Sequence, residues 1–371
     1  MKTNITYIVS NIDKALAFEW IAYKLDKEKF NLSFILLNPG DSALETYLKL
    51  IDVKVERMLY TSKFDLPIVI FKLILFFIKN KTKIVHCHLF DACIAGLIAS
   101  KLLFMKKRIF TRHYSTNHHD YYPNAVKYDK FINYLATDIV SISKNVSKVL
   151  INKENVNPDK IHLIHHGFDL KAFNEVENSR IVQIREKYKI PENKYIVGVI
   201  SRYVELKGLQ YIIPAFASFL KQNPNSFLIL SNASGDYKNE VNKLLQDFLP
   251  QSTYVEIKFE SDLPALYKLM NTFIHVPIDE TIEAFGQTYV EALASGVPSI
   301  FTLSGVANEF IVHDKNALVV DYKNSEEIKN AIIRLLNDPV LRNKLIEEGK
   351  KSSQVFDLKK YIFQLENLYL N

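Results

Sequence analysis

The chain has 371 residues, of which 48% are hydrophobic, 12% aromatic and 24% charged. This length predicts about two domains, and this composition excludes a disordered or low-complexity protein. The net charge of +6 is uneven, because Lys and Arg outnumber Asp and Glu by 24 to 15 in residues 1–165, whereas residues 166–371 hold 23 and 26.

Short apolar runs alternate with helical patterns along the first half of the chain. Strands are predicted at residues 5–9, 32–37, 83–88, 108–111, 138–141 and 161–165. Helices are predicted at residues 15–25, 66–78 and 144–152. This alternation is typical of a parallel sheet in an α/β domain.

The same rhythm restarts after Pro191. Strands are predicted at residues 195–200, 226–230, 255–258, 273–276, 299–301 and 317–319, and a last helix at 358–370. Residues 167–192 have few strand signals and are interpreted as a linker. We therefore expect one Rossmann-like domain over residues 1–166, a second over 167–355, and a terminal segment, 356–371, that packs back on the first.

The cysteines and the apolar segments predict a cytoplasmic protein. Cys87 and Cys93 are too few to staple a chain of this size, and the N-terminus has no signal-peptide pattern. The most apolar stretch, residues 66–78, is shorter than the about 20 residues that a bilayer span needs. The basic first half instead predicts weak association with an anionic membrane surface, with scattered solubilising lysines as the alternative. No signature of nucleic-acid binding is present.

The glycines exclude the common nucleotide-binding loops. No two of the ten are two positions apart, so the Gly-x-Gly-x-x-Gly fingerprint of a hydride-transferring enzyme is absent. A P-loop and a Gly-x-Ser-x-Gly hydrolase elbow are absent too. There is no Asp-x-Asp pair that would clamp a metal-bound diphosphate.

One segment combines two glutamates with a predicted helix start. Glu283 and Glu291 flank Phe285, Gly286 and Gln287, whose backbone N–H groups are expected to point out of the helix N-terminus toward a phosphate or a sugar. Alone, this segment could be an ordinary unit of helix and strand with an acidic residue on its surface.

Two cations follow the first strand of the second predicted domain. Arg202, Lys207 and Gly208 lie in the loop after residues 195–200, and open α/β sheets bind ligands at such carboxyl ends. Arg202 can hold a phosphate bidentately and Lys207 can add a point charge. Solvated surface cations are the simpler interpretation of the same residues.

Together these motifs resemble the retaining glycosyltransferases of family 4, which have the GT-B fold. The resemblance includes the Glu-x7-Glu spacing of Glu283 and Glu291, the loop from Arg202 to Gly208, and the segments 166–169 and 305–309. It implies an α/β protein with two Rossmann-like domains facing each other across a cleft. It also implies transfer from a nucleotide-diphosphate sugar to a glycan or lipid-linked saccharide, without metal or cofactor, in surface polysaccharide or glycolipid synthesis.

The resemblance implies a role for each matching residue. Arg202 and Lys207, with Gly208 in their loop, hold the donor diphosphate and stabilise the leaving charge. Glu291 binds the ribose hydroxyls, and Glu283 lies near the donor sugar with the N–H groups of Phe285, Gly286 and Gln287. His113, which follows a strand of the first domain, faces the donor sugar; a histidine that merely caps the strand end is the alternative.

The first loop departs from the family pattern. It reads Ser-Asn-Ile-Asp-Lys instead of carrying a glycine pair, so Asn11, Asp13 and Lys14 are candidates for contact with acceptor or phosphate. A metal site built from His86, His88 and residues 118–119 is a minor alternative, as is a glycosidase built on the two glutamates. A sugar-nucleotide epimerase, a small-glycoside synthase and a non-catalytic nucleotide-sugar-binding protein are the alternative functions.

Overall fold

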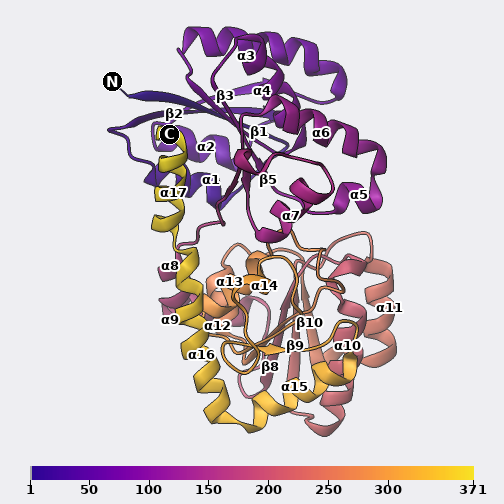
Figure 1. Cartoon of the computed structure of the whole chain (residues 1–371). Helices are drawn as coiled ribbons and strands as arrows, with labels where there is room; N and C mark the ends of the chain where they lie inside the picture. The colour runs from indigo at the N-terminus through magenta and orange to yellow at the C-terminus, as the bar shows by residue number, and fades with distance from the viewer. Residues whose placement is uncertain (1) are drawn as a thin grey trace. The chain divides into compact units, whose positions relative to one another are not determined.

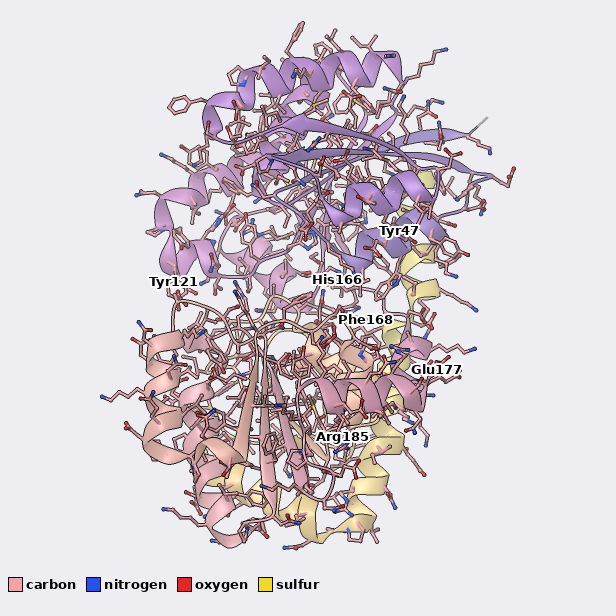
Figure 2. The ribbon with its side chains drawn as sticks, turned by 180° about the vertical axis from the view of Figure 1, so that it is seen from behind. Tyr47, Tyr121, His166, Phe168, Glu177 and Arg185 are labelled. Atoms are coloured by element: carbon pink, nitrogen blue, oxygen red, sulfur yellow. The ribbon has the colours of Figure 1, made fainter. Side chains whose placement is uncertain are left out.

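The computed structural model describes residues 2–371 as two compact units, each a parallel sheet covered by helices (Figure 1). The first unit runs to Phe168 and includes Leu358–Asn371. The second unit is Asp169–Asp357. His166 and Phe168, labelled in Figure 2, lie at the end of the first continuous stretch. Within residues 2–371, no helix is both long and apolar enough to cross a bilayer.

In the described part of the chain, the first unit has a seven-stranded sheet in the order β3-β2-β1-β4-β5-β6-β7. The strands are β1 Thr3–Ser10, β2 Phe30–Asn38, β3 Lys54–Leu59, β4 Ile84–His88, β5 Lys107–Arg112, β6 Asp138–Ser141 and β7 Ile161–Leu163. All neighbouring pairs are parallel. The direction of strand addition reverses between β1 and β4, and this switch point is where such sheets bind ligands.

Helices cover both faces of the first sheet. They are α1 Leu16–Lys24, α2 Ala43–Leu50, α3 Leu66–Lys79, α4 Phe90–Leu102, α5 Asn117–Tyr121, α6 Val126–Leu135, α7 Lys144–Asn152 and α17 Leu358–Leu370. α1, α2 and α17 pack on one face, and α3, α4 and α6 lie on the other (Figure 1). Gly96 allows α4 to approach closely, because a Cβ there would lie 2.5 Å from Cys87 Sγ and 2.6 Å from Ile8 Cδ1.

The last helix, α17, completes the core of the first unit. Leu358, Ile362 and Leu365 are buried among side chains of β1, β2 and α1. Gly167 makes room for this helix, because a Cβ at that position would lie 2.5 Å from Tyr361 Cβ.

In the second unit, residues 169–357 form a six-stranded parallel sheet in the order β10-β9-β8-β11-β12-β13. The strands are β8 Tyr195–Ile200, β9 Ser226–Ser231, β10 Tyr254–Ile257, β11 Thr272–His275, β12 Ser299–Phe301 and β13 Leu318–Val319. The switch point lies between β8 and β11, so the loops that follow these two strands share one edge of the sheet.

Helices also cover both faces of the second sheet. They are α8 Leu170–Asn174, α9 Asn178–Lys187, α10 Leu209–Gln222, α11 Lys238–Phe248, α12 Leu263–Lys268, α13 Gln287–Ala294, α14 Ala307–Phe310, α15 Ser325–Asn337 and α16 Pro339–Ser353. α10, α11 and α15 share one apolar core with the sheet. Short 3-10 turns are Lys63–Asp65, Pro123–Ala125, Pro158–Lys160, Glu205–Lys207, Gln251–Thr253 and Gln354–Phe356.

The interpretation of residues 167–192 as a linker is wrong. They contain α8 and α9, and Arg180 on α9 donates to Asp262 at the start of α12 through two hydrogen bonds of 2.6 and 2.8 Å. Glu177 and Arg185, labelled in Figure 2, mark the two ends of this helix region. The segment lacks strand signals because it is helical and packs on the second unit.

The edge strand β3 was not predicted. Of its six residues only Met58 is buried, while Lys54, Glu56 and Arg57 give the segment the polarity of a loop. An edge strand needs little apolar surface, and charged residues protect it from pairing with other chains.

Candidate functional site

A tight turn after β8 brings Lys207 to the switch point of the second sheet. The residue ends a short 3-10 turn, and Gly208 follows it with φ of 77° at the start of α10. A Cβ at Gly208 would lie 2.2 Å from the carbonyl oxygen of Val276, the residue just after β11. Glycine is therefore required here for both its conformation and its size.

Lys207, Glu283 and His275 form one largely buried cluster at this point. Lys207 Nζ donates to Glu283 Oε1 in an ion pair, and His275 Nε2 lies 3.1 Å from the same oxygen. The side chains of Lys207 and Glu283 are 19% and 11% exposed. Loops that are far apart in sequence thus place a cation and an anion together beside β8 and β11.

The cluster holds Glu283 in its ionised form. Burial alone raises the pKa of this carboxyl, but the charge of Lys207 and the hydrogen bond from His275 outweigh burial and hold the pKa well below its usual range. Burial lowers the pKa of His275, so its neutral ring donates from Nε2. An ionised carboxylate only accepts hydrogen bonds, which suits it to sugar hydroxyl donors.

Glycines shape the loop that carries Glu283. Gly305 has φ of 58°, and a Cβ there would lie 2.7 Å from Glu283 Cβ. Ser304 Oγ accepts a hydrogen bond of 3.1 Å from the Glu283 N–H. Gly286 adopts φ of 87° immediately before α13.

Backbone N–H groups at the start of α13 remain available to a ligand. The N–H groups of Gly286 and Gln287 form no hydrogen bond within residues 2–371. Phe285 is buried against Phe356, with ring centroids 5.6 Å apart, and its carbonyl accepts from Val306. Phe285 therefore anchors the loop through its side chain.

Glu291 lies on α13 and is 8% exposed. Tyr267 OH donates to Glu291 Oε2 at 3.0 Å. Burial raises the pKa of Glu291 to about 7, even though the Tyr267 hydrogen bond lowers it. Unlike Glu283, this carboxyl changes protonation state near neutral pH.

Arg202 is exposed, and its guanidinium forms no hydrogen bond or ion pair with any residue from 2 to 371. Its backbone belongs to the ordered turn after β8, where the Arg202 carbonyl accepts from Val204 at 2.9 Å. Within residues 2–371 the side chain is thus a cation with no internal partner, on a backbone that this turn holds.

The first loop of the first unit is closed by its own side chains. Asn11 has φ of 51°, a conformation that usually requires glycine, and its amide donates to Asp91 Oδ2 at 3.3 Å across the switch point. Asp13 Oδ1 accepts from the N–H of Ala43 at 3.0 Å and so caps α2. Lys14 is exposed. Asn11 and Asp13 therefore each have a hydrogen-bond partner within the first unit.

His113 belongs to a row of histidines in the first unit. His88 Nδ1 lies 3.1 Å from His113 Nε2, and the rings of His113 and His166 stack with centroids 5.7 Å apart. Burial lowers the pKa of His113 to about 4 and that of His166 to about 3. These rings are neutral at physiological pH.

Only one proton lies between His88 and His113. His88 Nε2 is buried and has no hydrogen-bond partner within residues 2–371, and a buried N–H without a partner is the less tolerated alternative. We therefore assign the His88 proton to Nδ1, which donates to His113 Nε2. This assignment leaves the proton of His113 on Nδ1.

The histidines of the minor metal-site alternative do not form a ligand set. His86 Nδ1 lies 2.7 Å from Tyr369 OH and its Nε2 lies 2.8 Å from Thr111 Oγ1. His118 and His119 instead contact Asp129 and Glu154. No group of three or more His, Cys, Asp or Glu side chains within residues 2–371 is arranged to hold a metal ion.

Sequence reasoning missed two residues of the second-unit site. His275 was included in a predicted strand, and its place at the carboxyl end of an otherwise apolar run was the available signal. Tyr267 gave no signal, because an aromatic residue in an apolar helix is usually part of the core.

Two family models match the chain. The model described as Glycosyltransferase Family 4 matches residues 21–172, and the model described as Glycosyl transferases group 1 matches residues 181–352. Together they span most of both units.

Relatives and solved structures agree with these models. A capsular polysaccharide biosynthesis glycosyltransferase, CapM of Staphylococcus aureus, is 28% identical over 76% of this chain and 74% of its own. The alpha-monoglucosyldiacylglycerol synthase of Acholeplasma laidlawii is 25% identical over 79% and 76%. Anabaena HepE, solved in complex with UDP and glucose, superposes with a TM-score of 0.84 at 20% identity over 99% of both chains.

These matches define a glycosyltransferase with the GT-B fold of two Rossmann-like domains. The chain belongs to the family 4 type of these enzymes.

Proposed function

We propose that this protein transfers a sugar, with retention of anomeric configuration, from a nucleoside diphosphate sugar held by the second unit. The cluster of Lys207, Glu283 and His275 at the β8/β11 switch point carries the proposal. Lys207 and the exposed Arg202 bind the diphosphate, and Glu283 accepts hydrogen bonds from the sugar hydroxyls. The N–H groups of Gly286 and Gln287 supply further donors.

In the proposed step, the bond from the sugar C1 to the diphosphate oxygen breaks while the acceptor oxygen bonds to C1 from the same side. The acceptor proton passes to the departing phosphate, which leaves as nucleoside diphosphate. Arg202 and Lys207 stabilise the negative charge that grows on the leaving group. Glu283 already interacts with Lys207 and His275, so its proposed role is to position the donor sugar. No protein group is assigned as nucleophile or base.

The first unit is proposed to hold the acceptor, a glycan or a lipid-linked saccharide. His113 and the loop after β1 lie near the carboxyl ends of β5 and β1 in that unit. Relatives named for capsular polysaccharide and for glucosyldiacylglycerol synthesis support this choice.

Donor nucleotides are expected to raise the melting temperature of the protein. Ligands that bind only the folded state stabilise it by about 2.7 kcal/mol at a hundredfold excess over Kd. We expect one nucleoside diphosphate and its sugar to produce the shift without metal, in a panel that begins with UDP and UDP-glucose. The measurement is thermal unfolding with and without magnesium. No shift with any nucleotide would contradict the donor assignment.

Affinity for the nucleotide sugar is expected to fall as pH drops below about 7. Ribose hydroxyls donate to the ionised form of Glu291, whose pKa is about 7. Protonation of this carboxyl therefore lowers the affinity by up to about tenfold for each pH unit below that value. The measurement is Kd between about pH 5.5 and 8.5 by calorimetry. A nucleotide sugar is used because the terminal phosphate of a free nucleotide itself titrates near pH 6.

Glu291→Gln is the matched control for this pH profile. The amide keeps the shape and cannot ionise, so the variant should bind more weakly at pH 8 and with a flatter pH dependence. Equal slopes in both proteins would assign the titration to another group.

We also propose that the first unit docks on the cytoplasmic face of an anionic membrane. The outer face of α3 and of the turn before it carries an exposed apolar stripe. Its members, exposed by 52% to 94%, are Phe64, Ile68, Phe71, Leu75 and Ile78. Lys72 and Lys79 are the charged residues of α3 and are both exposed. Apolar insertion and lysine attraction are the two components of interfacial binding.

Flotation with vesicles of anionic lipid tests this docking. We expect binding at low salt that weakens at high salt. Phe71→Asp should abolish it, because a carboxylate then replaces an exposed aromatic ring in the stripe. Val182→Asp on α9, also exposed at 41%, is the control. Unchanged flotation of Phe71→Asp would refute the docking surface.

A further inference from the structure

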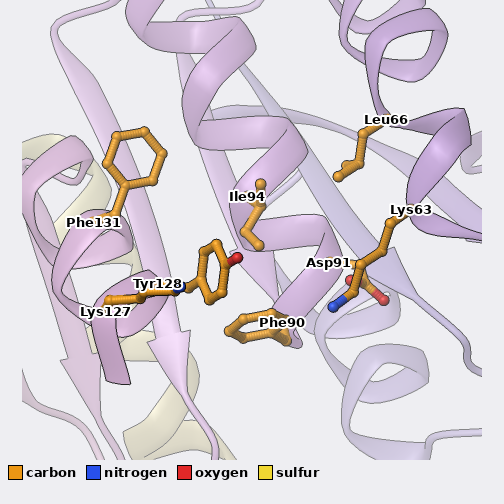
Figure 3. A pocket seen from close by; sticks show the side chains of 8 residues that line it. All are labelled: Lys63, Leu66, Phe90, Asp91, Ile94, Lys127, Tyr128 and Phe131. Atoms are coloured by element: carbon orange, nitrogen blue, oxygen red, sulfur yellow. The ribbon is translucent and has the colours of Figure 1, made fainter. Parts of the chain in front are cut away.

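The first unit contains an apolar pocket of about 500 Å³ that the proposed site does not use. It lies between the N-terminal ends of α3 and α4 and the first turns of α6 (Figure 3). Leu66, Phe90, Ile94, Tyr128 and Phe131 supply the apolar lining, and Figure 3 shows the Tyr128 ring between Phe90 and Ile94. The volume is within the usual range of small-molecule sites.

The lining of the pocket includes two lysines, Lys63 beside Asp91 and Lys127 on the other side of the Tyr128 ring (Figure 3). Neither ammonium forms an ion pair within residues 2–371, and that of Lys127 lies 5.1 Å from the centroid of the Tyr128 ring. Asp91 is the acidic residue of the lining, and its carboxylate already accepts from Asn11. The charge therefore complements an anionic group at the end of an apolar chain.

The position of the pocket ties it to the acceptor side of the reaction. Phe90 and Asp91 begin α4, one residue after the end of β4, at the switch point of the first sheet. Phe90 also borders a smaller cavity lined by Thr111 and His113. Leu66 begins α3, whose outer stripe is the proposed membrane-docking face, so the same helix contributes to the pocket and to that face.

We infer that this pocket holds the apolar chain of a phosphate-bearing lipid acceptor, with Lys63 and Lys127 against the phosphate. The inference rests on the proposed function and selects the lipid-linked class among its acceptors. The chain is buried against Ile94 and Phe131, and the part of the lipid to be glycosylated extends past Phe90 toward His113.

Dodecyl phosphate is the probe for this site, at concentrations below micelle formation. We expect saturable binding of about one molecule per chain by calorimetry, and inorganic phosphate or dodecyl maltoside should bind at least about tenfold more weakly. Each methylene of the dodecyl chain that leaves water adds to the affinity. A variant that keeps two of these methylenes out of the pocket should therefore bind about tenfold more weakly. Equal affinity for inorganic phosphate and dodecyl phosphate would overturn the inference that the pocket holds an apolar chain.

Matched variants on α6 locate the binding. Phe131→Asp puts a carboxylate into the pocket and should weaken dodecyl phosphate binding by about tenfold or more. Tyr134→Asp adds the same charge three residues further along, at a residue that is 70% exposed and outside the pocket, and should leave binding unchanged. Equal weakening by both variants would show a general charge effect and refute the site.

Ile94→Trp is the second variant, because it fills the pocket without a charge. It should lose dodecyl phosphate binding but still float with anionic vesicles. Phe71→Asp should bind dodecyl phosphate but no longer float with the vesicles. Retained binding in Ile94→Trp would overturn the inference. Nucleotide-induced stabilisation is measured on every variant, so that failure of the donor site is distinguished from failure of the pocket.

Discussion

Arg202→Ala should lower kcat/KM by about 10²–10³ and leave the melting temperature unchanged. Removal of one preorganised donor to a developing oxyanion typically has an effect of this size. Arg202 is exposed and has no internal partner within residues 2–371, so its loss removes no interaction from the folded state. The measurements are initial rates with the donor found by thermal shift, and thermal unfolding of both proteins.

Lys221→Ala is the control for Arg202→Ala. Lys221 is an exposed cation in the last turn of α10, far along the same helix from the switch point. The substitution changes net charge by the same amount and should leave kcat/KM within about twofold. Wild-type turnover in Arg202→Ala would contradict the assignment of Arg202 to the donor site.

Glu283→Ala should abolish turnover and also destabilise the second unit by about 3 kcal/mol. The substitution leaves the Lys207 ammonium in a largely buried place without its carboxylate, and a buried charge without its partner is costly. Glu283→Gln keeps an acceptor oxygen and the side-chain volume but also removes the charge that pairs with Lys207. It should therefore be destabilised less than Glu283→Ala, while kcat/KM falls about a hundredfold.

A double-mutant cycle separates the ion pair from catalysis. Lys207→Met combined with Glu283→Gln should be less destabilised than the sum of the two single variants, because the charges are removed together. In all three variants kcat/KM should stay at least about a hundredfold below that of the wild type. Additive stability changes would contradict the pairing, and near-wild-type kcat/KM in any variant would contradict the assignment of this cluster to the donor site.

The sequence predicted the fold because the patterns of both sheets are strong. Long apolar strands such as residues 195–200 match the structure, and a buried parallel strand needs such a continuous run. β3 was missed because an edge strand needs few apolar residues. α8 and α9 were mistaken for a linker because short helices with mixed faces lack a clear periodicity.

The proximity of Lys207 and Glu283 is set by topology. They lie 76 positions apart, and only the adjacency of β8 and β11 brings their loops together. The motifs that follow two predicted strands indicated Lys207 and Glu283 separately. No pattern in the sequence predicted that these two side chains form an ion pair. The raised pKa of Glu291 depends on burial and on Tyr267, neither of which a spacing can reveal.

Asn11 and Asp13 in the first loop stay candidates for contact with acceptor or phosphate. They stand where the family pattern has a glycine pair, and each is exposed and also has a hydrogen-bond partner in the first unit. A sequence position alone cannot distinguish a polar side chain that faces a ligand from one that closes its own loop.

The place of α17 has a consequence for folding during synthesis. The first unit needs Leu358–Asn371 to cover one face of its sheet, and these residues leave the ribosome after the whole second unit. The nascent first half therefore lacks the helix whose Tyr369 contacts Tyr7 and Phe30 on that face until Leu358–Asn371 are synthesised, while the second unit can fold as a contiguous stretch. Completion of the first unit therefore follows synthesis of the second unit, and until then the first half depends on protection from aggregation.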